Sequence, residues 1–120
     1  MCPDRDELLP GVELVRIAPA EEGALSAEVR VAAGSPLFDG HFPGQPVLPG
    51  VAVVGLVVAL CRRAFGDVAV KGLERVKLLA PVSPGARLRV SVRRAGSLSR
   101  FEVVSGSDGA RVASGAIAWE

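Results

Sequence analysis

The chain has 120 residues, a formal net charge of +1 and 49% hydrophobic residues. Since one hydrophobic core typically organises about 100 to 150 residues, we expect residues 1–120 to form a single domain. The composition excludes a disordered chain, and the small net charge gives no sign of a nucleic-acid or membrane partner.

The beginning of the chain predicts two paired strands after an irregular start. Residues 1–11 are expected to be flexible or irregular. Their acidic first part lacks the basic and apolar regions of a signal peptide, so we expect a cytoplasmic protein. Residues 12–17 are typical of a short strand. From Leu25 to Val31, apolar residues alternate with polar ones, which is the pattern of a strand with one solvated face.

A loop rich in glycine and proline, residues 33–49, separates these strands from a long apolar segment. Long loops without regular structure inside compact domains are usually functional. Residues 50–65 predict a helix that is apolar on every side, and we therefore expect it to be buried on every side. Arg62 and Arg63 suit its last turn, and Gly66 suits the residue that ends it. The apolar run is short of the roughly twenty residues that cross a bilayer.

The rest of the chain predicts four more strands. They cover about residues 68–79, 87–94, 99–105 and 110–119, with turns at 83–85, 95–97 and 107–109. Leu88, Val90 and Val92 are expected to face the core. One helix can be buried by this many strands only if the sheet curls around it, which is the α+β hotdog fold. A small β-barrel plugged by the helix is the alternative.

Neither of the two cysteines, Cys2 and Cys61, predicts a metal site, because no CxxC spacing and only one histidine accompany them. Cys61 lies in the apolar segment and is expected to pack as a small hydrophobic residue. From Cys61 onward, Arg and Lys outnumber Asp and Glu eleven to five. This basic half either receives an anionic partner or forms a solvated face that includes Arg87, Arg89, Arg93 and Arg94.

One segment carries a specific motif. Residues 38–51 read Phe-Asp-Gly-His-Phe-Pro-Gly-Gln-Pro-Val-Leu-Pro-Gly-Val. They resemble the GHFPGxPxxPGV signature of the FabA/FabZ-type 3-hydroxyacyl-acyl-carrier-protein dehydratases. Residues 77–88 are similar to the strand and turn that follow the central helix in that family, and the resemblance covers about residues 12–119. It implies a dimeric hotdog protein that dehydrates 3-hydroxyacyl thioesters in fatty-acid or polyketide-type metabolism.

The resemblance also implies roles for single residues. His41 matches the catalytic histidine of the family, and an imidazole with its ordinary pKa of about 6.5 suits proton abstraction. Gly50 matches the residue whose amide holds the thioester carbonyl, and it stands where the predicted helix leaves N–H groups unpaired. The substrate-contacting positions correspond here to Phe42, Pro43, Gly44, Pro49, Val51 and Val54. No cofactor is implied, since the substrate brings its own phosphopantetheine arm on an acyl carrier protein or coenzyme A.

One position departs from the family pattern. The acid of the family stands fourteen residues after the histidine, and this chain has Gly55 there. A glycine inside a helix costs about 1 kcal/mol relative to alanine, so we expect a reason for it, such as close helix packing or room for a substrate chain. Asp39 and Glu74 are the acids that we expect nearest the pocket as replacements.

Three functions remain open. The chain is a dehydratase in which His41 carries both proton transfers, or the acid-lacking half of a heterodimer whose homologous partner supplies the carboxylate, or an acyl-binding or carrier-binding module without chemistry. A thioesterase is disfavoured, because hotdog thioesterases also usually need a helix carboxylate. We further expect a homodimer, or a heterodimer where such a partner exists. An acidic carrier is expected to dock on the basic surface around Arg62, Arg63 and the strand arginines.

Overall fold

The computed structural model describes residues 6–19, 23–38, 48–66 and 69–120. One α-helix and seven strands make up the regular structure of these residues, with one short 3-10 helix. In chain order they are β1 (Asp6–Leu9), β2 (Val12–Pro19), β3 (Ala24–Val31), η1 (Pro36–Phe38), α1 (Gly50–Phe65), β4 (Val70–Leu78), β5 (Arg87–Ala95), β6 (Leu98–Ser105) and β7 (Arg111–Trp119).

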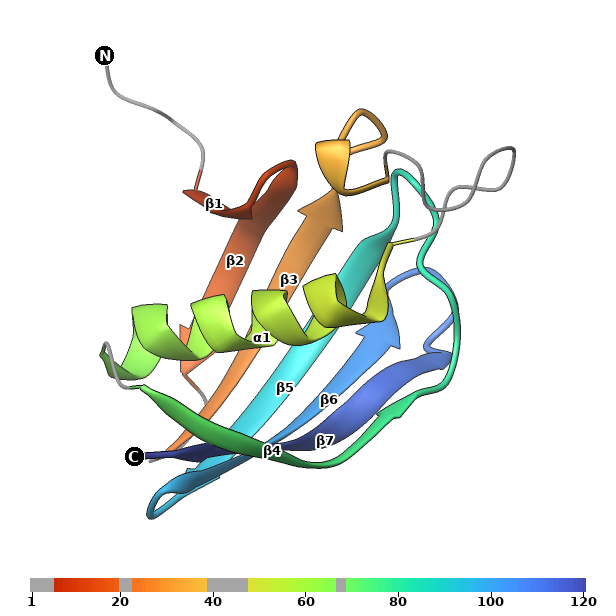
Figure 1. Cartoon of the computed structure of the whole chain (residues 1–120). Helices are drawn as coiled ribbons and strands as arrows, with labels where there is room; N and C mark the ends of the chain where they lie inside the picture. Colours follow the sequence, from red (N-terminus) through yellow and green to blue (C-terminus); the bar gives the residue numbers. More distant parts are fainter. Residues whose placement is uncertain (1–5, 20–22, 39–47, 67–68) are drawn as a thin grey trace.

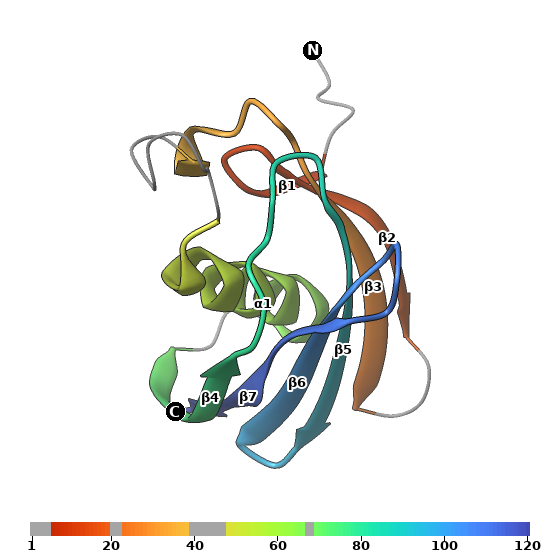
Figure 2. The ribbon, with the colours of Figure 1, turned by 90° about the vertical axis from the view of Figure 1, so that its right-hand side faces the viewer.

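The seven strands form one antiparallel sheet in the order β1-β2-β3-β5-β6-β7-β4. The sheet curves around α1, which lies across its concave face (Figures 1 and 2). Because β4 follows the helix but pairs with β7, the chain crosses from one side of the sheet to the other through α1. This is the predicted hotdog arrangement. The barrel alternative is wrong, because the sheet stays open, with β1 and β4 as its edges.

Alternation along the strands makes the core. Leu88, Val90 and Val92 of β5 are at most 2% exposed, as their spacing predicts, and they pack against the buried face of α1. Fully burying a side chain of this size stabilises a fold by about 1.5–3 kcal/mol. The polar atoms inside this core are satisfied, since the indole N–H of Trp119 donates to Ser99 Oγ at 3.0 Å. Among the described residues, no buried side-chain nitrogen or oxygen lacks a hydrogen-bond partner.

The helix begins and ends where the sequence predicts, but the expectation that it is buried on every side is wrong. Ala52, Leu56 and Leu60 face the sheet and are buried, whereas Val51 on the opposite side is 81% exposed. The physical reason is that one curved sheet wraps only one side of a helix. The chain therefore leaves an apolar stripe of α1 uncovered near its N-terminus. No helix among the described residues is long and apolar enough to cross a membrane.

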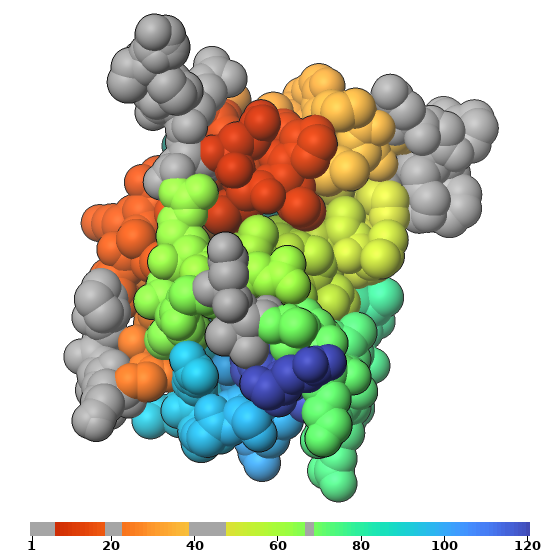
Figure 3. Space-filling view, turned by 60° about the vertical axis from the view of Figure 1, so that its left-hand side comes forward, coloured from red at the N-terminus to blue at the C-terminus, as the bar shows by residue number. Residues whose placement is uncertain are grey.

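The expectation of an irregular start over residues 1–11 is wrong for its second half. Residues 6–9 form β1, which pairs with β2, while residues 1–5 lie outside the described part of the chain. Leu8 and Leu9 pack against the core, and the strand turns tightly at Gly11, whose N–H donates to the Glu7 carboxylate at 3.0 Å. Gly11 has a φ of 76°, a conformation that favours glycine. Figure 3 shows the atoms of this first hairpin against those of α1.

Candidate active site

The first turn of α1 leaves its backbone N–H groups open. Pro49 precedes the helix and provides no side-chain cap, and the first turn contains no acidic residue. The earliest bonds inside the helix are from the N–H groups of Ala52 and Val53 to Pro49 O, at 2.9 and 3.2 Å. The N–H groups of Gly50 and Val51 precede these bonds and point out of the helix end, with its positive partial charge. Such an end stabilises an oxygen that becomes negative during a reaction.

An apolar hollow of about 300 Å³ lies beside this helix end. Its walls come from the helix start, from the end of β4 with the segment after it, and from β7. They are formed by Leu48, Gly50, Val53, Leu78, Leu79, Ala80, Pro81, Val82 and Val112. Backbone bonds hold these walls together, since Leu48 N–H donates to Val82 O and Leu79 N–H donates to Val112 O, both at 2.8 Å. The hollow can receive an apolar chain next to an electropositive backbone.

Gly50 is glycine for a reason that the structure makes plain. A Cβ placed on it would overlap Cδ1 of Leu78, so any larger residue requires the leucine to move. Leu78 itself is more than half exposed and lies over the helix start. The sequence alone does not show this contact, because the two residues are 28 positions apart. The sequence hints at this contact only through the similarity of residues 77–88 to the strand and turn that follow the central helix in the FabA/FabZ family.

Gly55 is not explained by close packing inside this chain. A Cβ at this position would lie 3.6 and 3.9 Å from the two methyl carbons of Leu9, which is ordinary van der Waals contact. A side chain at position 55 therefore fits, and it would point toward β1. Gly55 does not line the hollow at the helix start. Since α1 contains no Asp or Glu, the helix offers no other acid to the site.

Several residues expected at the site lie outside the described residues. His41, Phe42, Pro43, Gly44 and Asp39 all fall in the segment 39–47. The described flanks of this segment are anchored, since Phe38 and Leu48 are 7% and 4% exposed.

Of the remaining expected contact residues, Pro49 and Val54 are half-buried and Val51 is exposed. Pro49 adjoins the hollow through Gly50. Neither Val51 nor Val54 is part of its lining.

Glu74 does not reach this hollow within one chain. It pairs with Ala116 on the sheet face turned away from α1, where it borders a different hollow with Leu98 and Arg100. Glu74 as a replacement acid in its own chain is therefore wrong. Arg62 and Arg63 lie at the far end of α1, about 18 Å of helical rise from Gly50.

The strand arginines divide between the two faces of the sheet. Arg87, Arg89 and Arg93 are exposed on the outer face, as a solvated face requires. Arg94 is the exception, because it is half-buried with its guanidinium 5.4 Å from the centre of the Phe65 ring.

Cys61 packs in the core, as predicted, with 1% of its surface exposed. Burial raises the pKa of the Cys61 thiol to about 11, and the nearby Arg94 charge only partly opposes this rise. The thiol stays protonated near neutral pH and does not act as a nucleophile. Among the described residues, no group of histidine, cysteine, aspartate or glutamate side chains could hold a metal ion.

Comparison with protein families gives one clear match, and curated relatives agree with it. The model of the ApeI-like family, described as ApeI dehydratase, matches residues 16–116. The 3-hydroxyacyl-[acyl-carrier-protein] dehydratase FabZ of Myxococcus xanthus is 32% identical over 128 residues, covering 96% of this chain and 82% of the relative. The FabZ of Desulforamulus reducens is 40% identical over 86 residues, covering 64% of this chain and 61% of the relative.

Solved structures show the same fold. The dehydratase heterocomplex ApeI:P from Xenorhabdus doucetiae superposes with a TM-score of 0.80 at 22% identity, covering 88% of this chain and 95% of that chain. A hypothetical thioesterase with coenzyme A from Streptococcus pneumoniae gives a TM-score of 0.67 at 10% identity, covering 90% of this chain and 83% of that chain. These likenesses confirm a hotdog fold.

Proposed function

The chain belongs to the ApeI-like dehydratase family, and from that membership we propose that it serves the dehydration of 3-hydroxyacyl thioesters. The observation that supports this most directly is the uncapped start of α1 at Gly50 beside an apolar hollow. An acyl thioester fits this place, with its carbonyl oxygen at the amide and its chain in the hollow. The substrate carries its own phosphopantetheine arm, so no cofactor of the protein is required.

In the proposed mechanism, the imidazole of His41 removes a proton from the carbon next to the thioester carbonyl. The electron pair moves onto the carbonyl oxygen, and the Gly50 N–H stabilises the resulting negative charge. The pair then returns to form the carbon–carbon double bond as the C3–oxygen bond breaks. The hydroxyl group takes a proton and leaves as water, and the product is an enoyl thioester.

The proton for the leaving hydroxyl is the missing part. We propose that it comes from a carboxylate of a homologous partner, because α1 offers no acid and Glu74 lies on the other face of the sheet. The structure with the same fold described as the dehydratase heterocomplex ApeI:P supports a pairing of two different subunits. When the chain stands alone, His41 has to carry both transfers, and loss of one acid–base group lowers a rate by about 10² to 10⁴.

An unpartnered surface supports a dimer. The edge strand β4 leaves one row of backbone groups unpaired, and Leu73, Leu78 and Leu79 near that edge are about half exposed. Val51 continues this apolar area onto the helix start. Open edges and apolar patches of this kind are where chains associate. We therefore propose that the single domain works as a dimer, with a second copy or with a homologue that bears the acid. We also propose that it works in the cytoplasm, as its curated relatives of fatty-acid synthesis suggest.

The test is formation of enoyl thioester from a 3-hydroxyacyl thioester on an acyl carrier protein. We expect slow turnover by the chain alone and a gain of about 10² or more when an acid-bearing homologue is added. A protein that binds the thioester but forms no enoyl product in either case is a binding module, which would contradict the proposal. Release of free acid instead would identify a thioesterase.

A further inference from the structure

The outer face of the sheet, turned away from α1, carries basic side chains in two different arrangements. In the first part, four arginines form ion pairs with glutamates of neighbouring strands. The ion pairs are Arg16–Glu28 at 3.4 Å, Arg87–Glu28 at 3.0 Å, Arg30–Glu13 at 3.8 Å and Arg111–Glu102 at 3.1 Å. Arg89 and Arg93 are also exposed on this face, and Glu28 is shared by two arginines, so these ion pairs offset only part of its positive charge.

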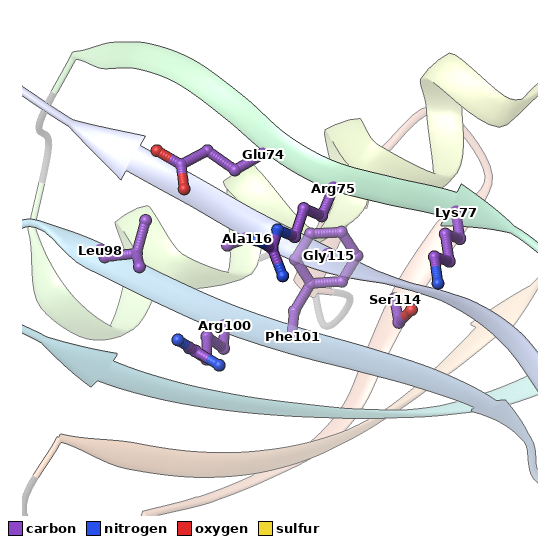
Figure 4. Close-up of a pocket in the computed structure, with 9 residues that line it drawn as sticks. All are labelled: Glu74, Arg75, Lys77, Leu98, Arg100, Phe101, Ser114, Gly115 and Ala116. Carbon is purple, nitrogen blue, oxygen red and sulfur yellow. The ribbon is translucent and has the colours of Figure 1, made fainter.

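The second part is a hollow of about 460 Å³ over β4, β7 and β6 (Figure 4). Arg75 and Lys77 line it from β4, with Lys77 next to Ser114, and Arg100 lines it from β6. Within the described ranges, none of the three cations forms an ion pair, and Glu74 is the one acidic residue of the lining. We call Arg75, Lys77 and Arg100 the β4 cation cluster.

A bulge in β4 creates this cluster. Glu74 pairs with Ala116 and Lys77 pairs with Ser114, so three steps along β4 match only two along β7. In a regular strand, residues three apart face opposite sides of the sheet. The extra residue instead puts Lys77 on the outer face with Glu74. Arg75 within the bulge has a φ of 52°, in the left-handed region that non-glycine residues rarely adopt.

The same bulge couples the cluster to the active site. Leu78, the residue after Lys77, turns toward α1 and lies over Gly50. The cluster thus begins one residue from the rim of the hollow at the helix start. Arg62 and Arg63, in contrast, lie about 18 Å of helical rise away at the other end of α1.

We propose that the β4 cation cluster docks the acidic surface of the carrier protein that delivers the thioester, in place of the surface around Arg62 and Arg63. This inference rests on the proposed function, in which the substrate arrives on a carrier. Three cations face one carboxylate in this hollow, so an acidic protein surface complements it. Charges at the rim of an interface act mainly through association rate and its dependence on salt.

Two charge-reversal pairs test the proposal. Lys77→Glu/Arg100→Glu removes the cluster without touching the bulge residue Arg75, and Arg62→Glu/Arg63→Glu is the matched control with the same change in net charge. Binding of a 3-hydroxyacyl-loaded acyl carrier protein is measured for each at low and raised salt. We expect the first pair to weaken binding by about tenfold or more and to reduce its salt dependence, and the second to change it less than about twofold.

Equal losses in both pairs, a larger loss in the control pair, or binding that does not depend on salt would overturn the proposal. Thermal unfolding of each variant shows that the fold is kept, and the milder Lys77→Gln/Arg100→Gln pair replaces a variant that fails to fold.

Turnover of the same acyl group on free pantetheine, with the acid-bearing homologue present, separates this proposal from the proposed function. Neither charge-reversal pair should change that turnover, because no carrier is involved. If no thioester is dehydrated but the carrier binds as expected, the proposed function fails and the docking site stands. If pantetheine thioesters are dehydrated and the cluster variants bind the carrier normally, the docking site fails.

Discussion

The first and second turns of α1 differ in what the site asks of them. In the proposed mechanism the reaction needs a backbone N–H at Gly50, and any helix that starts here after Pro49 provides one. At Gly55 the family pattern predicts a carboxylate, which only a side chain can supply, and glycine has no side chain. A contribution made by the backbone persists as long as the fold does, whereas one made by a side chain is lost in a single substitution. The comparison predicts a site that is formed but lacks one proton donor.

The largest effect should come from His41, the proposed base. In any active form of the protein, His41→Ala should lower the rate of enoyl formation by about 10² to 10⁴, because no other proton acceptor is assigned to this step. The measurement is turnover of a 3-hydroxyacyl thioester under saturating substrate. Unchanged turnover of His41→Ala would show that His41 is not the base and would contradict the proposed site beside Gly50.

Gly55→Glu should supply the carboxylate that the second turn of α1 lacks. A Cβ at position 55 meets only the side chain of Leu9 at ordinary contact distance, so the backbone need not move. We expect turnover by the chain alone to rise by a factor on the order of 10² or more. Gly55→Gln, which has the same shape without the acid, is the control and should give no gain. Thermal unfolding has to accompany the rate, because a half-buried carboxylate lowers stability.

Gly50→Ala tests the first turn of α1, where the backbone N–H is the proposed contribution. The added methyl group overlaps Leu78, whose exposed side chain can move, and it narrows the approach to the amide. We expect a loss of turnover of about tenfold, with a change in the free energy of unfolding of about 1 kcal/mol. Gly72→Ala is the matched control, since nothing lies within 4 Å of a Cβ at Gly72. Equal effects of the two substitutions would remove the special role of Gly50.

The smallest effect concerns Cys61 in the fourth turn of α1. Its pKa is raised by burial to about 11, so the folded state keeps the thiol protonated at a pH where the unfolded chain ionises. The contribution of the protonated thiol to the free energy of unfolding is complete below the ordinary thiol pKa. As pH rises toward about 11, the free energy of unfolding falls by roughly 2 kcal/mol. Urea unfolding at mildly and strongly alkaline pH measures this loss. In Cys61→Ala the free energy of unfolding should fall less between the two pH values. A fall equal to that of the unaltered protein would contradict the raised pKa of Cys61.

How much the sequence predicts depends on whether a feature is local. The bounds of α1 follow from Gly50 and Gly66, and the strands from alternation, because these signals lie within each element. The sequence does not predict strand β1, because its four residues begin with two acids and show no alternation of polar and apolar side chains. The uncovered side of α1 is missed because periodicity does not say how far a sheet wraps around a helix.

The candidate site divides in the same way. The motif predicts the roles of Gly50 and Gly55, whereas the contact of Leu78 with Gly50 comes only from the structure. The β4 cation cluster could not be predicted, because the bulge between Glu74 and Lys77 reverses which face each later residue takes. His41 stays a prediction from the motif, since it lies in the segment 39–47, outside the described residues.

The most direct test of the central claim, a formed site that lacks only an acid, is complementation between two inactive halves. An acid-bearing homologue whose own catalytic histidine has been replaced is mixed with this chain, and enoyl formation is followed with each protein alone and with both together. The claim predicts little turnover by either protein and a gain of about 10² or more in the mixture, which His41→Ala in this chain removes. A heterodimer that forms but stays inactive would contradict it.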